Sequence, residues 1–139
     1  MNKLSIYAFL LVSLNGFCQK IDKEFITGTW KVVKIEKVSN NPNFKDLIKS
    51  FKLSIFYFKD DETFEIETKN KTQLFSMMTR MFNKSNWKIG KLNEILVGTE
   101  KDRFSIMLIN VVLKNNEIFF DLSEEDQFPL VLKVEKIKE

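Results

Sequence analysis

The side chains of this sequence that could do chemistry are mainly carboxylates. The chain has no histidine and one cysteine, Cys18, which excludes Ser-His-Asp and Cys-His catalysis and histidine-held metal sites. The clusters Asp60-Asp61-Glu62 and Glu124-Glu125-Asp126 offer oxygen ligands of the kind that Ca²⁺ prefers. Neither cluster has the ligand spacing or the glycine of a calcium loop. Turn formation explains both, and we expect no metal site and no cofactor.

Catalysis would have to depend on Asp, Glu, Lys or Tyr side chains in a pocket. A pair of carboxylates could hydrolyse a glycosidic bond, but the distance between them cannot be read from a sequence. No spacing singles out one such group, so we expect a protein that is not an enzyme.

The charge pattern argues against nucleic acid as a partner. Lys and Arg total 22 and Asp and Glu 19, for a net charge of +3 over 139 residues. Arginine occurs only at Arg80 and Arg103, and the lysines are scattered between acids. Phosphate backbones are usually bound by clustered, arginine-rich stripes. We therefore expect no nucleic-acid binding and no strongly anionic membrane as a partner.

The first residues have the pattern of a secretory signal peptide. Lys3 precedes an apolar stretch from Leu4 to Leu14, which is shorter than the ~20 residues that span a bilayer. Cleavage after Cys18 would place small residues where the peptidase reads them and leave Gln19 as the mature N-terminus. We therefore expect a signal peptide over 1–18, a secreted or periplasmic protein, and no transmembrane segment after cleavage.

A lipid anchor on Cys18 is the alternative location. A bacterial lipobox has a small residue directly before the cysteine, and this chain has Phe17 there. Secretion as a free protein is the simpler interpretation.

Residues 19–139 contain no repeat, linker or low-complexity tract, which predicts a single domain. Short β-rich runs recur between turn signals and predict eight strands. These strands cover residues 29–38, 53–59, 63–68, 86–90, 95–99, 104–113, 117–122 and 130–137. Each strand follows its predecessor through a short connection, apart from two helical segments. We expect an all-β fold with two short helices, an eight-stranded antiparallel up-and-down β-barrel.

Two local patterns predict details of these strands. In the first strand, the apolar phase changes from Trp30 and Val32 to Val33 and Ile35, which predicts a β-bulge or a strong bend. Asp60-Asp61-Glu62 joins the second and third strands as a tight hairpin turn.

Two segments have helical periodicity. Asn41-Pro42 is an N-cap signal, and Phe44, Leu47, Ile48 and Phe51 follow at the spacing of one helix face. The second helix is expected over Lys71–Phe82, with Asn70 as N-cap and Asn83 in the left-handed position after its end. Its apolar residues cover more than one stripe, and they make it a candidate lid over the barrel. The lid residues are Leu74, Met77, Met78, Met81 and Phe82.

Three short motifs occur in a fixed order: Gly28-Thr29-Trp30, Phe58-x-x-Asp61-x-x-Phe64, and Trp87-x-Ile89. This order resembles the bacterial lipocalin-like domain family, whose members are secreted calycin-type barrels, from about Phe25 to Ile137. The resemblance implies that Gly28 and Trp30 form a structural plug at the closed end of the barrel. It also implies a basic residue over the tryptophan, for which the last strand offers Lys133 and Lys136.

An eight-stranded barrel either is filled by side chains or holds one small ligand. The residues expected to point inward, and to line a ligand site if the barrel is open, are Phe56, Phe58, Phe64, Ile66, Trp87, Ile89, Ile106, Leu108, Phe120, Leu132 and Val134. An open barrel closed by the Lys71–Phe82 helix predicts a monomer that binds a small apolar molecule. A filled barrel predicts a cell-envelope interaction module whose surface or Met-rich helix docks on another protein.

Overall fold

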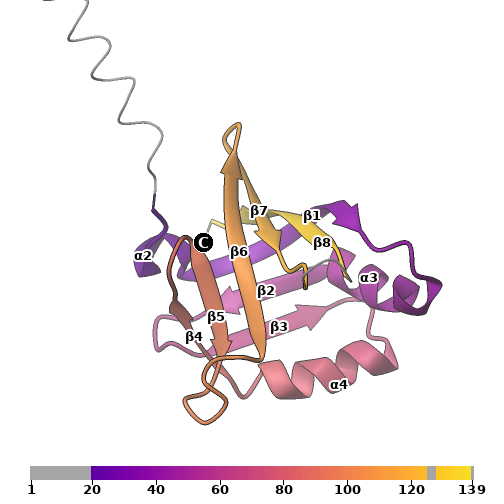
Figure 1. Ribbon diagram of the computed structural model, residues 1–139, viewed down its shortest axis with the longest axis horizontal. Helices are drawn as coiled ribbons and strands as arrows, with labels where there is room; N and C mark the ends of the chain where they lie inside the picture. The colour runs from indigo at the N-terminus through magenta and orange to yellow at the C-terminus, as the bar shows by residue number, and fades with distance from the viewer. Residues whose placement is uncertain (1–19, 125–127, 139) are drawn as a thin grey trace, which may run out of the picture.

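The computed structural model describes residues 20–124 and 128–138. Within them the chain forms eight antiparallel strands in a nearly closed barrel, as the sequence predicts (Figure 1). The strands are β1 (Gly28–Val38), β2 (Ser54–Phe58), β3 (Phe64–Thr68), β4 (Asn86–Ile89), β5 (Glu94–Gly98), β6 (Met107–Lys114), β7 (Glu117–Asp121) and β8 (Leu130–Lys136). The predicted signal peptide and two residues of the second acidic cluster, Glu125 and Asp126, lie outside the described residues.

The sheet follows chain order and is joined through its first and last strands. The spatial order is β3-β2-β1-β8-β7-β6-β5-β4, so every strand except β1 and β8 pairs only with neighbours in sequence. The register of β1 on β8 shifts between Val32 and Lys34 and again between Ile35 and Lys37. The β-bulge predicted from the changing apolar phase of this strand is therefore confirmed, and a second irregularity follows it.

Left-handed backbone positions lie in several of the connections between strands. In the hairpin between β2 and β3, Asp61 Oδ1 accepts hydrogen bonds from the Thr63 amide at 3.0 Å and hydroxyl at 2.6 Å, and Glu62 has a φ of 71°. The predicted turn is confirmed. In contrast, β6 begins three residues later than the sequence pattern indicates, because Arg103 and Phe104 have φ values of 60° and 55°.

Four short helical segments accompany the barrel. They are α2 (Lys23–Ile26), a 3₁₀ turn η1 (Pro42–Phe44), α3 (Lys45–Lys52) and α4 (Gln73–Phe82). Asn41 caps η1 through a 3.0 Å bond from the Asn43 amide, which confirms the predicted N-cap signal. The sequence did not predict α2.

The helix α4 ends at Phe82 as predicted, but its predicted start and both predicted caps are wrong. The helix starts at Gln73, and Thr72 Oγ1 is the cap, because it accepts a hydrogen bond from the Phe75 amide. The carbonyl of Asn70 instead accepts a 2.7 Å bond from the Ser50 hydroxyl. Asn83 has a φ of −73°, in the right-handed region.

The barrel is weakest between β3 and β4, and α4 covers this seam. These two strands share one isolated bridge, between Thr63 and Asn86. Beyond it, the Ile66 amide donates to Asn83 Oδ1 at 3.1 Å, directly after the end of α4. The Asn83 side chain therefore accepts a hydrogen bond from a β3 amide that would otherwise pair with a carbonyl of a neighbouring strand.

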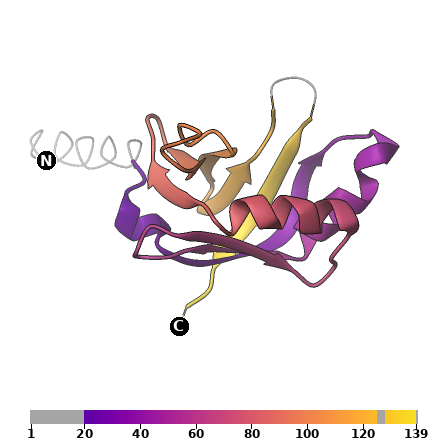
Figure 2. The same ribbon diagram turned by 90° about the horizontal axis from the view of Figure 1, so that it is seen from below.

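The two ends of the barrel differ in their connections (Figure 2). At one end lie α2 and the short β2–β3, β4–β5 and β6–β7 turns, and we call this the α2 end. The longer connections, with α3 and α4, gather at the other end, which we call the α3/α4 end.

Aromatic side chains fill the barrel toward the α2 end. The Phe120 ring on β7 lies 5.4 Å from Trp30, 5.5 Å from Phe56 and 5.9 Å from Phe58, measured between centroids. Phe64 adds a ring 5.2 Å from Phe58. We call these five residues the aromatic block. None is more than 1% exposed, so they form the packed centre of the barrel.

Trp30 is held by contacts from both ends of the described chain. Its Nε1 donates to the Ile26 carbonyl at 2.8 Å. Lys136 places its Nζ 5.7 Å from the Trp30 ring centroid and donates to the Phe25 carbonyl at 2.9 Å. Lys133 instead pairs with Glu117 at 3.0 Å, so Lys136 is the basic residue that covers the tryptophan.

Gly28 makes this close approach possible. A Cβ at residue 28 would lie 2.8 Å from Lys136 Cε, and the φ of Gly28 is +136°, a conformation that other residues rarely adopt. The glycine and the tryptophan therefore act together at this end.

Replacing Phe120 with alanine should destabilise the protein by about 3 to 5 kcal/mol, because the cavity would open among three other rings. Urea denaturation monitored by Trp fluorescence measures this loss. Phe25→Ala is the control, since the Phe25 side chain also contacts Trp30 but is 37% exposed. Equal losses in the two variants would contradict a core centred on Phe120.

Candidate functional site at the α3/α4 end of the barrel

Most of the residues predicted to line the barrel fill it. Eight of the eleven are at most 2% exposed and pack in the core. They are Phe56, Phe58, Phe64, Ile66, Trp87, Phe120, Leu132 and Val134. None of these eight borders the pocket at the α3/α4 end. The centre of the barrel therefore matches the filled alternative.

Leu108 does not point into the core, because the buried residues of β6 are Ile109 and Val111 and Leu108 is 46% exposed. Its side chain nevertheless borders the pocket at the α3/α4 end, as that of Ile106 does. The run from Met107 to Leu113 is apolar on both faces, and a period-two pattern cannot fix its phase. Ile89 and Ile106 are half-buried at the edge of the core.

An open pocket of about 540 Å³ lies at the α3/α4 end. Leu47 and Phe51 of α3 and Met78 and Phe82 of α4 form part of its wall. The remaining wall comes from the β5–β6 connection, the start of β6, and the described residues on either side of the β7–β8 connection. Those residues include Ile106, Met107, Leu122, Phe128 and Leu130.

The two faces of α4 have different surroundings. On the inner face, the Phe75 ring lies 5.3 Å from Phe51 and the Phe82 ring lies 6.3 Å from Phe64. Met78, between them on the helix, borders the pocket. The predicted lid helix thus contributes two of its five proposed residues, Met78 and Phe82, to the pocket.

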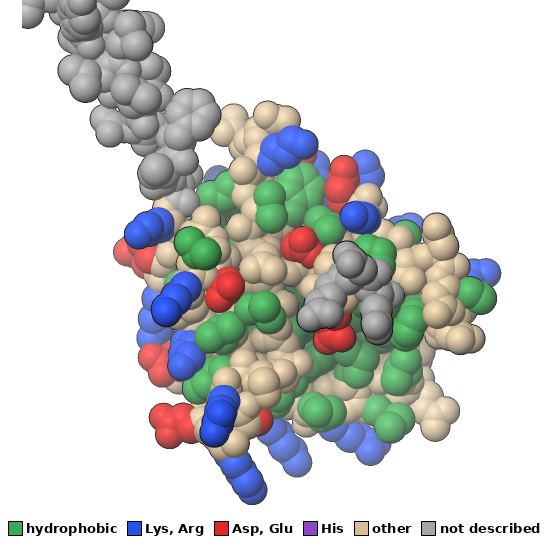
Figure 3. Space-filling model, in the orientation of Figure 1, with side chains coloured by type: hydrophobic (Ala, Val, Ile, Leu, Met, Phe, Trp, Pro, Cys, Tyr) green, Lys and Arg blue, Asp and Glu red, His purple; other side chains and the backbone are tan. Residues whose placement is uncertain are grey.

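The other three proposed lid residues point away from it. Leu74, Met77 and Met81 are 45%, 56% and 59% exposed. They contribute to the hydrophobic side chains that gather over α4 in the space-filling view (Figure 3).

Sequence reasoning missed much of the pocket wall. Leu47 and Phe51 were recognised as the apolar face of a helix but not assigned to a site. Phe128 packs edge-on against Phe44, with ring centroids 4.7 Å apart. The strand order contains a signal that would have found these residues. Every second connection of an up-and-down barrel lies at the same end, so the residues of these connections come together there.

Few polar groups in the pocket are free to bind a ligand. The Ser105 hydroxyl donates to the Asp102 carbonyl at 2.6 Å. Ser123 Oγ accepts from the Leu130 amide at 3.0 Å. Glu124 is exposed at the border. The pocket therefore presents mainly apolar surface, which suits a small apolar molecule.

The connection between β5 and β6 is held in place by Asp102. Its carboxylate accepts bonds from the Thr99 amide at 2.9 Å and hydroxyl at 2.8 Å, and from the Ser105 amide at 3.2 Å. The Thr99 amide in particular lowers the pKa of this carboxyl group. At Gly98, a Cβ would lie 2.6 Å from the Phe104 Cα, so this connection also requires a glycine.

The other described groups with shifted pKa values lie outside the pocket. A hydrogen bond to Glu67 raises the pKa of Tyr57 to about 12. The Thr63 hydroxyl lowers the pKa of Asp61, and bonds to Glu65 and Glu117 raise the pKa values of Lys59 and Lys133. Each shift arises from a surface pair or a turn. Among residues 20–124 and 128–138, no three acidic or thiol side chains come close enough to hold a metal ion.

None of the helices in the described part of the chain has the length and apolar character needed to cross a membrane.

Comparisons with known proteins add no assignment. No family model matches this chain, and no curated protein and no solved structure matches it.

Proposed function

We propose that this protein is a secreted lipocalin-like binding protein that holds a small apolar molecule. The observation that carries the proposal is the pocket of about 540 Å³ at the α3/α4 end, with Met78 and Phe82 of α4 in its wall. The ligand lies over the aromatic block, at the mouth of the barrel, because the block leaves no room farther inside.

The chemistry of the pocket supports an apolar ligand. Its volume is within the ~300 to 1,000 Å³ typical of small-molecule sites. Methionine side chains adapt to irregular apolar shapes, and aromatic side chains bury large areas. The Ser105 hydroxyl already donates to the backbone, whereas the Ser123 hydroxyl hydrogen and the Glu124 carboxylate are left to a ligand. With so few polar groups, the pocket selects by shape more than by polar contacts.

A neutral apolar dye, N-phenyl-1-naphthylamine, tests this site. Its fluorescence should rise on binding, and Met78→Trp should weaken binding about tenfold or more because the larger side chain fills the pocket. The readout is a fluorescence titration, with thermal melts to confirm that each variant is folded.

Met77→Trp is the matched control for this titration. Met77 is the preceding residue on the same helix, but it is 56% exposed on the outer face. Its substitution should leave the dye affinity unchanged. Equal effects of the two substitutions, or no dye binding to the wild type, would count against the pocket.

Export through the leader at residues 1–18 is part of the proposal. The protein purified from its source should have Gln19 as its first residue, since cleavage after Cys18 fits the small residues Gly16 and Cys18. Intact mass spectrometry measures this directly. A mass that retains Cys18 with a diacylglyceryl group would instead establish the lipid-anchored form.

The exposed face of α4 favours a second candidate function, an envelope interaction module. Leu74, Met77 and Met81 present apolar side chains to solvent on one helix, as protein-binding surfaces often do. In this case the barrel serves as a scaffold and a partner protein covers these residues.

Site-specific photocrosslinking in the source cells separates the two candidates. A benzophenone amino acid at position 77 should give one adduct of defined mass if a partner covers the outer face of α4. The same probe at position 78 should give none, because Met78 borders the pocket. Absence of any adduct at position 77 would remove this second candidate.

A further inference from the structure

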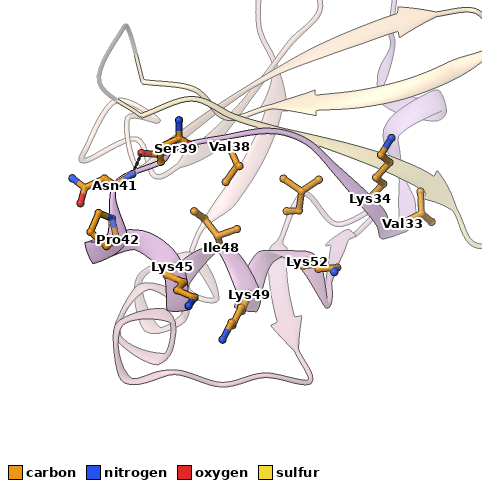
Figure 4. Close-up of a pocket in the computed structure, with 12 residues that line it drawn as sticks. Val33, Lys34, Val38, Ser39, Asn41, Pro42, Lys45, Ile48, Lys49 and Lys52 are labelled. Carbon is orange, nitrogen blue, oxygen red and sulfur yellow. Dashed lines mark hydrogen bonds between the residues drawn. The ribbon is translucent and has the colours of Figure 1, made fainter.

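A second hollow lies on the outside of the barrel, between the second half of β1 and α3. Its volume is about 650 Å³. Val38 and Ile48 point toward one another across it (Figure 4). Val33 and Val38 are 38% and 37% exposed, so the floor of this groove is an apolar surface open to solvent. We call this hollow the β1/α3 groove.

Lysines surround that apolar floor. Lys34, Lys45, Lys49 and Lys52 line the groove, and its lining contains no acidic residue among those described. Lys34 Nζ lies 3.6 Å from a Glu36 carboxylate oxygen. In residues 20–124 and 128–138, no carboxylate oxygen lies within 4 Å of the ammonium groups of Lys45, Lys49 and Lys52. The groove therefore has an excess of positive charge.

The helix dipole explains only part of this arrangement. Lys49 and Lys52 lie in the last turn of α3, where the dipole favours cations, but Lys45 is the first residue, where the dipole disfavours one. Lys49 follows it at four residues and Lys52 at three more, spacings at which like charges are neighbours and repel each other. An anion placed among these ammonium groups would relieve the repulsion.

We propose that the β1/α3 groove binds a fatty acid, a single-chain amphiphile with a carboxylate head. The carboxylate lies at the outer edge of the groove along α3, where Lys45, Lys49 and Lys52 supply charge-assisted hydrogen bonds. Figure 4 shows Lys45 and Lys49 extending from α3 away from Val38, so the head group lies beyond the apolar floor. The acyl chain covers Val38 and Ile48 together with the methylene stems of the lysines. The site is separate from the pocket at the α3/α4 end, whose described lining contains Glu124 but no lysine, so the protein can hold two ligands of different chemistry.

The test is calorimetric titration of the mature protein with dodecanoate below its micelle concentration. The double variant Lys45→Gln/Lys49→Gln should weaken binding about tenfold or more, because it removes two of the cations that face the carboxylate. The double variant Lys91→Gln/Lys101→Gln is the control. It makes the same change in net charge at two exposed lysines outside the groove and should leave the affinity unchanged.

Two further measurements locate the fatty acid. A dodecanoate with a nitroxide on its chain should broaden the methyl resonances of Ile48 and Val38, and Met78→Trp should leave its affinity unchanged. Dodecanol, which has the same chain without the charge, should bind the wild type more weakly. Equal loss in both lysine variants, broadening confined to Met78, or no binding of dodecanoate would overturn the proposal.

Discussion

The structure depends on how five large rings fill one end of a small barrel. Phe120 contacts Trp30 on β1 and Phe56 and Phe58 on β2, and thus ties strands that are far apart in sequence. Because an eight-stranded barrel is only wide enough for its own side chains or one small ligand, this block decides where a ligand can go. Among the described residues, space remains at the α3/α4 end, in a hollow of about 330 Å³ beside Trp87 and Ile89 at the α2 end, and on the outer surface.

The incomplete pairing of β3 with β4 determines the position of α4. A single bridge leaves backbone donors of β3 without a strand partner, and Asn83 after α4 accepts one of them. The helix is therefore part of the barrel wall. That position turns Met78 and Phe82 inward and leaves Met77 and Met81 at the surface. One element thereby supplies both the pocket wall and the exposed apolar face.

Much of the fold could be predicted from the sequence, because strand alternation and turn residues are local signals. The hairpin at Asp61 and the irregularity near Val33 are examples. Failures came where local signals are ambiguous. β6 is apolar on both faces, so the alternation does not show that Leu108 lies outside the core, at the border of the pocket. Pocket residues such as Leu47 and Phe128 come together only through the closure of the barrel, and side-chain periodicity does not report it.

The central claim is that the barrel is solid among its aromatic rings and that a neutral apolar ligand enters at the α3/α4 end, whose pocket is larger than the one at the α2 end. Nuclear magnetic resonance of protein labelled at methionine methyl groups and tryptophan indoles, titrated with a neutral apolar probe, tests it most directly. We expect the methyl signals of Met78 and Met107 to shift, while the indole signals of Trp30 and Trp87 stay in place because their hydrogen bonds lie away from the pocket. Saturable shifts of the Trp30 and Trp87 indole signals, with Met78 unchanged, would contradict the account.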